Sequence, residues 1–169
     1  RMQARGWVDC TEQPAAFAGY AGTPQAGPVL NSEQAGALAA ISAARAGFGC
    51  FALDGVTGSG KTEVYLQLIE RCLADGKQAL VLVPEIGLTP QMIQRFESRL
   101  GSAIAVLHSA LNDSQRLAAW VAAREAQVPV ILGTRSAIFT PLARPGLIII
   151  DEEHDTSFKQ QDGFRYNAR

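Results

Sequence analysis

The sequence is poor in the features that mark secreted, membrane-spanning or strongly charged proteins. It has 169 residues with three cysteines, and 15 basic against 16 acidic side chains leave a net charge of −1. Cys10, Cys50 and Cys72 are too few and too widely spaced for a disulfide framework or a zinc site. No apolar run approaches the roughly 18 residues of a membrane span, and no secretory signal opens the chain. We therefore expect a cytoplasmic protein without the overall positive charge of a general nucleic-acid binder.

The remaining composition is that of a globular domain with a short N-terminal appendage. Hydrophobic residues make up 47% of the chain and charged residues 18%, which suits one domain with a sizeable core. Residues 11–28 are rich in alanine, glycine and proline, a composition typical of a linker. We expect residues 1–10 to be the tail of a preceding domain and residues 29–169 to form the main domain. The arginine before Met2 and the charged aromatic end predict a fragment of something longer, truncated at its C-terminal end.

The segment Gly55–Thr62, GVTGSGKT, matches the pattern of a phosphate-binding loop. Its glycines let successive backbone N–H groups turn inward on phosphate oxygens, and the helix that follows adds its positive end. We expect Lys61 to reach the β- and γ-phosphates and the Thr62 hydroxyl to bind Mg²⁺. The residues expected to hold a nucleoside triphosphate here are Gly55, Thr57, Gly58, Ser59, Gly60, Lys61 and Thr62.

A second segment, Leu147–His154, is an apolar run that ends in DEEH. The run predicts a strand buried on both faces, and ligands bind at the carboxyl ends of such strands in open α/β sheets. We expect Asp151 to hold Mg²⁺, directly or through water, and Glu152 to polarise an attacking water. Lys61, Asp151 and Glu152 are therefore the candidate catalytic residues. For His154 a purely structural hydrogen-bonding role stays open.

Strand-like and helix-like segments alternate along the chain. The predicted strands are residues 50–53, 78–83, 103–107, 128–132 and 146–150, and the predicted helices are residues 31–45, 62–73, 88–100 and 113–126. In the last helix Leu117, Trp120 and Val121 share one apolar face. This alternation predicts an α/β fold, a P-loop NTPase with a parallel sheet and helices on both faces.

Polar loops follow three of the predicted strands. They comprise residues 84–91, 108–113 and 133–137, and all should leave the edge of the sheet that carries the nucleotide site. The plainer interpretation is that Thr89, Asp113 and Ser136 only cap the helices that follow. The pattern leaves both interpretations open for each loop.

Five sequence blocks carry a family resemblance. They are GVTGSGKTEVYL, VPEIGLTPQ, LHSALNDSQR, GTRSAIFTP and IIIDEEHDTSFKQQDGFRYNAR. Block by block they resemble the PriA family of replication-restart helicases, the primosomal N′ proteins, over roughly residues 29–169. Residues 1–8 resemble the end of that family's winged-helix domain more weakly. The resemblance implies the first of two RecA-like lobes of a superfamily 2, 3′-to-5′ DNA helicase with a DExH box.

The resemblance also assigns roles by position. It gives Gln34 the recognition of adenine, Lys61 and Thr62 the phosphate and Mg²⁺ contacts, and Asp151 and Glu152 the metal and the water. Hydroxyls and cations bind phosphates without reading bases, and aromatic rings stack on unpaired bases. The residues expected to bind DNA are Thr89, Thr134, Arg135, Phe158, Lys159, Phe164, Arg165 and Tyr166. For the aromatic segment at residues 158–166, a core-anchoring role is the alternative.

The implied function follows from the family. The PriA family uses ATP and Mg²⁺ at stalled forks in the bacterial cytoplasm, and no membrane is involved. Its partners include forked or single-stranded DNA, primosome proteins and single-strand-binding protein. Zinc-binding cysteines and a second lobe with its arginines belong to parts of the family's sequence not found here. We expect this chain to bind ATP and hydrolyse it poorly. The alternatives are a DNA-binding or primosome-assembly module in which hydrolysis is secondary, and a different translocase.

Overall fold

The core of the protein is a four-stranded parallel sheet. The computed structural model describes residues 22–43, 47–56, 58–160 and 165–169. Within these residues the strands lie in the order β2-β3-β1-β4, and every pair is parallel. The strands are β1 (Gln78–Leu82), β2 (Ile104–Leu107), β3 (Val130–Gly133) and β4 (Pro145–Ile150). The α/β class and four of the five predicted strands are confirmed.

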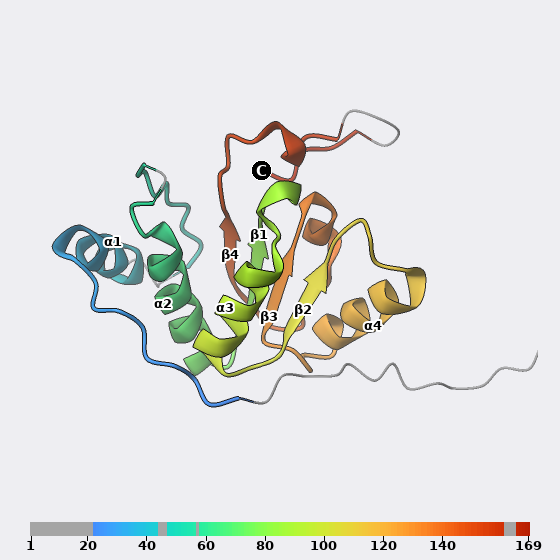
Figure 1. The fold of residues 1–169 in the computed structure, drawn as a ribbon, viewed down its shortest axis with the longest axis horizontal. Coiled ribbons are helices and arrows are strands. Elements are labelled where there is room, and N and C mark those ends of the chain that lie inside the picture. The colour runs from blue at the N-terminus through green and yellow to red at the C-terminus, as the bar shows by residue number, and fades with distance from the viewer. Residues whose placement is uncertain (1–21, 44–46, 57, 161–164) are drawn as a thin grey trace, which may run out of the picture.

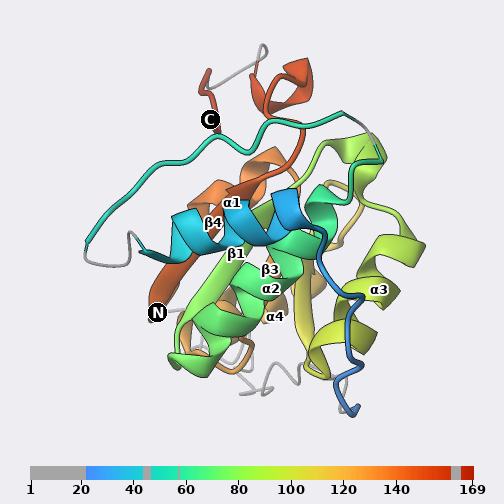
Figure 2. The same ribbon diagram turned by 90° about the vertical axis from the view of Figure 1, so that its left-hand side faces the viewer.

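Helices cover both faces of the sheet, as predicted. The α-helices of the described residues are α1 (Ser32–Ala43), α2 (Lys61–Ala74), α3 (Pro90–Leu100) and α4 (Asp113–Arg124). Short 3₁₀-helices follow three of the strands: η2 (Glu85–Gly87), η3 (Arg135–Phe139) and η4 (Thr156–Phe158). α2 and α3 pack on one face and α4 on the other (Figure 1). α1 packs on α2, so it forms an outer layer on that side (Figure 2).

β1 shows how a continuous apolar run builds two cores. Ala79 and Val81 face α2 and α3, whereas Leu80 and Leu82 face α4. Side chains alternate between the faces of a strand, so a strand covered on both faces needs apolar residues at every position. All five residues of β1 are buried, including Gln78, whose amide donates to the backbone carbonyls of Ala123 and Val128.

The strands end level with one another. Leu82 lies opposite Gly133 on one side and Ile150 on the other, and Gly133 lies opposite Leu107. The segments after all four strands therefore leave from one edge of the sheet, as predicted for the polar loops. The second motif leaves from this edge after β4, and the phosphate loop, at the start of α2, lies on the same side of the molecule (Figure 1).

The predicted strand at Cys50–Leu53 is wrong. Residues 48–56 form no regular secondary structure and pair with no strand of the described sheet, and Phe51 is 46% exposed while Leu53 packs against the core. The run follows Gly47 and Gly49, and ordering glycine costs more conformational entropy than ordering other residues. Burial of a single side chain offsets little of that cost, which explains why apolar composition alone did not place this segment in the sheet.

The large apolar side chains of α4 face away from the core. Leu117 is 59% exposed and Trp120 36% exposed, whereas Ala119, Ala122 and Ala123 are buried. Small side chains let the helix backbone approach the sheet closely, and the close packing of interiors favours that approach. The apolar face seen in the sequence therefore borders solvent, and the alanines make the contact with the sheet.

The helix starts combine side-chain caps with fixed backbone geometry. Thr89 Oγ1 accepts a hydrogen bond from Met92 N at 3.2 Å, and Pro90 opens α3. Asn112 and Gln115 form a reciprocal capping box at α4. The capping interpretation of Thr89 is confirmed, and Asn112 rather than Asp113 caps α4. Ser136 lies inside η3.

The described end of the predicted linker, residues 22–28, lies against α3. Gln25 N donates to the Ser98 carbonyl at 3.1 Å, and Arg99 Nη1 donates to the Gln25 carbonyl at 2.8 Å. Arg99 also forms ion pairs with Glu63, at 3.2 Å, and with Glu70 of α2. In Figure 1 this blue segment runs below the sheet, on the side opposite the phosphate loop.

Of the described helices, none is long and apolar enough to cross a membrane.

Candidate functional site

The phosphate-loop motif lies directly before α2, as predicted. Gly58 and Gly60 have a φ of +83°, a conformation that residues with a Cβ rarely adopt. A Cβ at Gly60 would also collide with the Gln34 side chain. Gly60 is the N-cap of α2, so the unpaired N–H groups of the first helical turn face the loop. These glycines give the motif the open backbone that phosphate oxygens need.

Lys61 lies between this loop and the end of β4. Its Nζ donates to the Gly55 carbonyl at 2.5 Å and lies 3.7 Å from Glu152 Oε1. The ammonium therefore lies between the loop and the Glu152 carboxylate that follows β4. The structure thus brings the two predicted motifs together through a single side chain.

Gln34 connects α1 to the same loop. Its Nε2 donates to the Ser59 carbonyl at 3.0 Å, while its Oε1 accepts from Asn31 N at 3.0 Å. The Asn31 side chain accepts from Gln34 N in return, which makes a capping box at the start of α1. The residue expected to recognise adenine thus lies beside the phosphate loop, with its amide held by both α1 and the loop.

Asp151 is the first residue after β4. Its backbone N–H donates to the Leu82 carbonyl at 2.9 Å, and its Oδ1 accepts a hydrogen bond from the Tyr65 hydroxyl at 3.2 Å. Burial raises the pKa of Asp151, and the Tyr65 hydrogen bond and the nearby Lys61 charge oppose that rise. The carboxylate oxygens of Asp151 are of the type that a hard cation such as Mg²⁺ prefers.

Glu152 has a strained backbone. Its φ is +49°, and among the described residues Ala126, in the turn that ends α4, is the other non-glycine residue with a positive φ. Such conformations are concentrated at functional sites, where the surroundings impose them. The side chain lies 3.7 Å from Lys61 and 3.7 Å from His154 Nε2, and His154 is exposed. Glu152 therefore faces the loop, as a residue that polarises water at the terminal phosphate would.

These residues fit a nucleoside triphosphate with Mg²⁺. The glycine backbone leaves room for phosphates, Lys61 supplies a positive charge, and Thr62 stands in the first turn of α2. Asp151 supplies the oxygen that Mg²⁺ prefers over nitrogen or sulfur. Thr57 lies outside the described residues.

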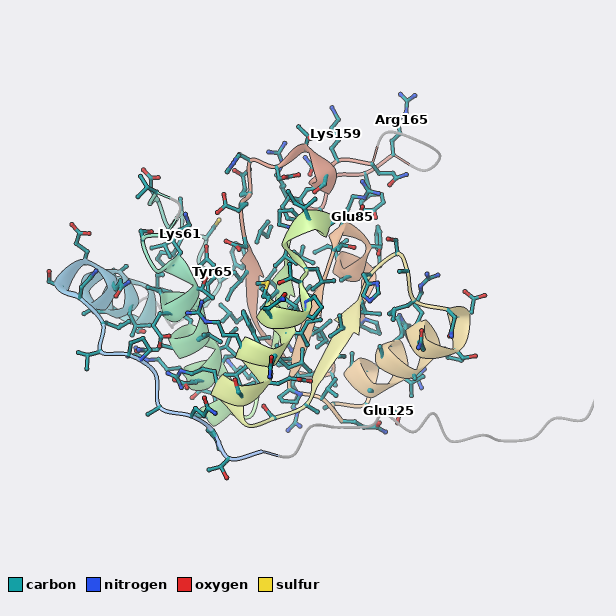
Figure 3. All side chains as sticks on the ribbon, in the orientation of Figure 1. Lys61, Tyr65, Glu85, Glu125, Lys159 and Arg165 are labelled. Carbon is teal, nitrogen blue, oxygen red and sulfur yellow. The ribbon has the colours of Figure 1, made fainter. Side chains whose placement is uncertain are left out.

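The residues expected to bind DNA differ in how far they are exposed. Thr134 is buried, and Phe158 is fully buried in the core on the α4 side of the sheet, so its ring offers no stacking surface. Lys159 and Arg165 project into solvent above the sheet edge (Figure 3). Thr89 is half-buried and caps α3. Phe164 lies outside the described residues.

Arg135 holds the C-terminal segment rather than projecting into solvent. Its Nη1 donates to the carbonyls of Ser157, at 2.8 Å, and Lys159, at 3.3 Å. The guanidinium also lies over the ring of Tyr166, 5.9 Å from its centroid. The predicted cation and the predicted aromatic ring are therefore in contact with each other.

A cleft of about 480 Å³ opens beside Arg135 and Tyr166. Aromatic and basic side chains from α4, η3 and the strand ends line it, including His108, Arg116, Trp120, Arg135, Phe139 and Tyr166. Sequence reasoning missed Arg116, Trp120 and Phe139, because apolar periodicity assigns Trp120 to a core-facing set. It also missed Tyr65, although Tyr65 lies one helical turn after Lys61 and so on the same side of α2.

Comparison with known proteins gives a consistent assignment. The family model described as DEAD/DEAH box helicase matches residues 31–168. The chain is 58% identical to the replication restart protein PriA of Haemophilus influenzae over 140 residues, which cover 83% of the chain and 19% of that protein. It is 55% identical to PriA of Bacillus subtilis over 119 residues, covering 70% and 15%.

A third relative agrees. PriA of Treponema pallidum is 52% identical over 140 residues, covering 83% of the chain and 21% of that protein. The resemblance carried by the five sequence blocks is thus confirmed. The chain spans about a fifth or less of the length of these three relatives.

Proposed function

Because the chain belongs to the DEAD/DEAH box helicase family, we propose that it is the ATP-binding lobe of a 3′-to-5′ DNA helicase. The proposal extends to a role in the restart of stalled replication forks and in primosome assembly. The observation that carries it is Lys61, placed between the phosphate loop and Glu152. That arrangement sets a cation where a terminal phosphate meets an attacking water, which is the chemistry of a nucleotide hydrolase.

Each residue of the site has a separate task. The loop backbone and Lys61 bind the phosphate oxygens, and Gln34 positions the adenine end beside α1. Thr62 and Asp151 hold Mg²⁺, which when bound neutralises charge on the phosphates. Glu152 accepts a hydrogen bond from the attacking water and orients it toward phosphorus. The positive φ of Glu152 sets the direction in which its side chain leaves the backbone, and the Lys61 ammonium lies 3.7 Å from its carboxylate.

Hydrolysis by this chain alone is expected to be close to background. In the proposed helicase, arginines of a second lobe stabilise the charge on the transferring phosphoryl group, and such groups contribute roughly 10³–10⁵ in rate. The residues around Lys61 and Glu152 supply the contacts to phosphate and water. We therefore expect this chain to bind nucleotide without a second lobe. Primosome proteins and single-strand-binding protein are the further partners of this proposal, and the bacterial cytoplasm is its location.

The DNA strand is proposed to cross the sheet edge beside the cleft. Lys159 and Arg165 are exposed there and suit phosphate contacts, while Tyr166 lines the cleft as a stacking surface. Thr89 contributes at the end of the segment after β1. Thr134 is buried and its backbone N–H donates to the Leu107 carbonyl at 3.0 Å, so its role in this proposal is to support the surface from below. Arg135 braces this surface from behind.

The test is a titration of fluorescent ATP and ADP analogues with Mg²⁺ into three proteins. These are the unchanged chain, Lys61→Ala and the control Lys77→Ala, which removes an exposed lysine outside the site. Loss of charge-assisted hydrogen bonds to phosphate should weaken binding about 10- to 100-fold in Lys61→Ala. Lys77→Ala should match the unchanged chain. Equal affinities of the unchanged chain and Lys61→Ala, both folded, would contradict the proposal.

A further inference from the structure

Tyr65 connects the phosphate-loop helix to the first carboxylate after β4. Its side chain is only 8% exposed, and its hydroxyl lies 3.2 Å from Asp151 Oδ1. Tyr65 and Lys61 stand one helical turn apart, so two successive turns of α2 face two successive residues, Asp151 and Glu152. The contact spans 86 positions of sequence and joins the two motifs a second time.

The direction of this hydrogen bond is fixed by chemistry. A phenol is protonated at neutral pH and an ionised carboxylate can only accept, so the Tyr65 hydroxyl is the donor. A buried phenol needs a hydrogen-bond partner, and Asp151 supplies it. One carboxylate oxygen of Asp151, Oδ1, is thereby held in place by Tyr65.

Packing alone does not require the hydroxyl. The ring of Tyr65 lies in the core cluster with Leu66, Ile69 and Ile149. A phenylalanine at position 65 would fill the same space. The hydroxyl adds one contact, and that contact ends on the residue proposed as the Mg²⁺ ligand.

We propose that Tyr65 is a positioning residue that orients the Asp151 carboxylate for Mg²⁺. This inference rests on the proposed function, since it assigns a role within the same nucleotide site. Groups that hydrogen-bond to metal-ligating carboxylates hold them in the binding orientation, and their loss typically lowers metal affinity about 10- to 100-fold.

The experiment compares the chain with its Tyr65→Phe variant, which keeps the ring and removes the hydroxyl. Binding of a fluorescent ADP analogue is measured in EDTA and then across a series of Mg²⁺ concentrations. In the variant, the Mg²⁺ concentration that gives half of the metal-dependent gain in affinity should rise about tenfold. Affinity in EDTA should stay unchanged, as should the thermal midpoint within about 2 °C.

Asp151→Asn and the double variant complete a cycle. When position 151 carries a neutral amide in place of the carboxylate, removing the Tyr65 hydroxyl should have no further effect on the Mg²⁺ response. Additive losses in the double variant would overturn the proposal, because Tyr65 would then act independently of Asp151. An unchanged Mg²⁺ response in Tyr65→Phe, or an equal loss of affinity in EDTA, would overturn it too. Should the unchanged chain show no Mg²⁺-dependent binding at all, the proposed function itself would fail and the role of Tyr65 with it.

Discussion

The phosphate loop and the C-terminal segment meet at the same edge of the sheet, yet they are built in opposite ways. The phosphate loop is glycine-rich, and its described residues 55, 56 and 58–60 are exposed or half-buried. The side chains of Lys61 and Gln34 contact its carbonyls, and Ser59 N donates to the Val56 carbonyl. Residues 155–160 and 165–169 are bonded to themselves and to the core. Lys159 and Asn167 form an antiparallel bridge, Ala168 N donates to the Phe158 carbonyl, and Phe158 is fully buried.

The difference separates two ways of making a binding surface. The loop is suited to bind through its own backbone N–H groups, so its glycines are required by backbone geometry and the loop can be recognised from local sequence. The C-terminal segment offers side chains such as Lys159 and Arg165, so its backbone is free to bond internally. Rigid support then comes from residues elsewhere in the chain, chiefly Arg135.

The largest expected effect tests whether Phe158 anchors the C-terminal segment. Phe158→Ala should lower the free energy of unfolding by about 3–5 kcal/mol, because it removes a fully buried ring and leaves a cavity. Phe139→Ala is the matched control. Phe139 is 59% exposed and touches the edge of Tyr166, so its loss should cost about 1 kcal/mol. Urea denaturation measures both, and equal costs would mean that the segment is not anchored in the core.

A smaller effect is expected for Arg135, which holds the C-terminal segment through two backbone carbonyls. Arg135→Lys removes the planar fork that meets the Ser157 and Lys159 carbonyls, and we expect a loss of about 1–2 kcal/mol. Hydrogen exchange at residues 157–160 should become faster, while affinity for nucleotide stays within about twofold. Arg144→Lys, on an exposed side chain, should change stability by less than about 0.5 kcal/mol. Equal hydrogen-exchange rates in both variants would show that Arg135 does not hold residues 157–160 in place.

The smallest effect concerns two aspartates with opposite pKa shifts. Burial raises the pKa of Asp151, so the folded chain binds that proton more tightly than the unfolded chain. Ionised Asp151 therefore lowers stability as pH rises through its folded-state pKa, and the loss persists at pH 7. Asp151→Asn should raise the thermal midpoint by about 2 °C at pH 7, with no gain below about pH 3.9.

Asp155 provides the reverse case. Hydrogen bonds from Ser157 lower the pKa of Asp155, one of them from Ser157 N at 2.7 Å. Its ionised form therefore adds stability above the unfolded-state pKa, and that stability is lost as pH falls through the folded-state pKa. Asp155→Asn should lower the thermal midpoint at pH 7. A shift of the same sign in both variants would show that the two carboxylates do not differ as the structure indicates.

The sequence predicted the parts of this protein that local chemistry determines. The glycines at positions 58 and 60, four of the five strands and the helices follow from backbone requirements and apolar periodicity, and these are found close to their predicted bounds. The position of Glu152 at the carboxyl end of β4 was also predicted, whereas Lys61 reaches it from the start of α2 without a preceding strand in the described sheet.

What the sequence did not predict depends on distant contacts. Nothing local marks Phe158 as a core residue, since an aromatic ring between polar residues fits a stacking surface equally well. The Tyr65–Asp151 and Arg135–Ser157 hydrogen bonds join segments whose distance depends on the whole sheet. Hydrophobicity alone placed Trp120 on the apolar face of its helix. The close approach of α4 to the sheet instead puts the small alanine side chains in the contact.

The docking of residues 22–28 on α3 makes this stretch part of the folded domain. A chain spans at most about 3.3–3.6 Å per residue, so these seven ordered residues fix up to roughly 25 Å of chain. They are held at the side of the sheet opposite Lys61, so the phosphate loop is left uncovered by this stretch (Figure 1).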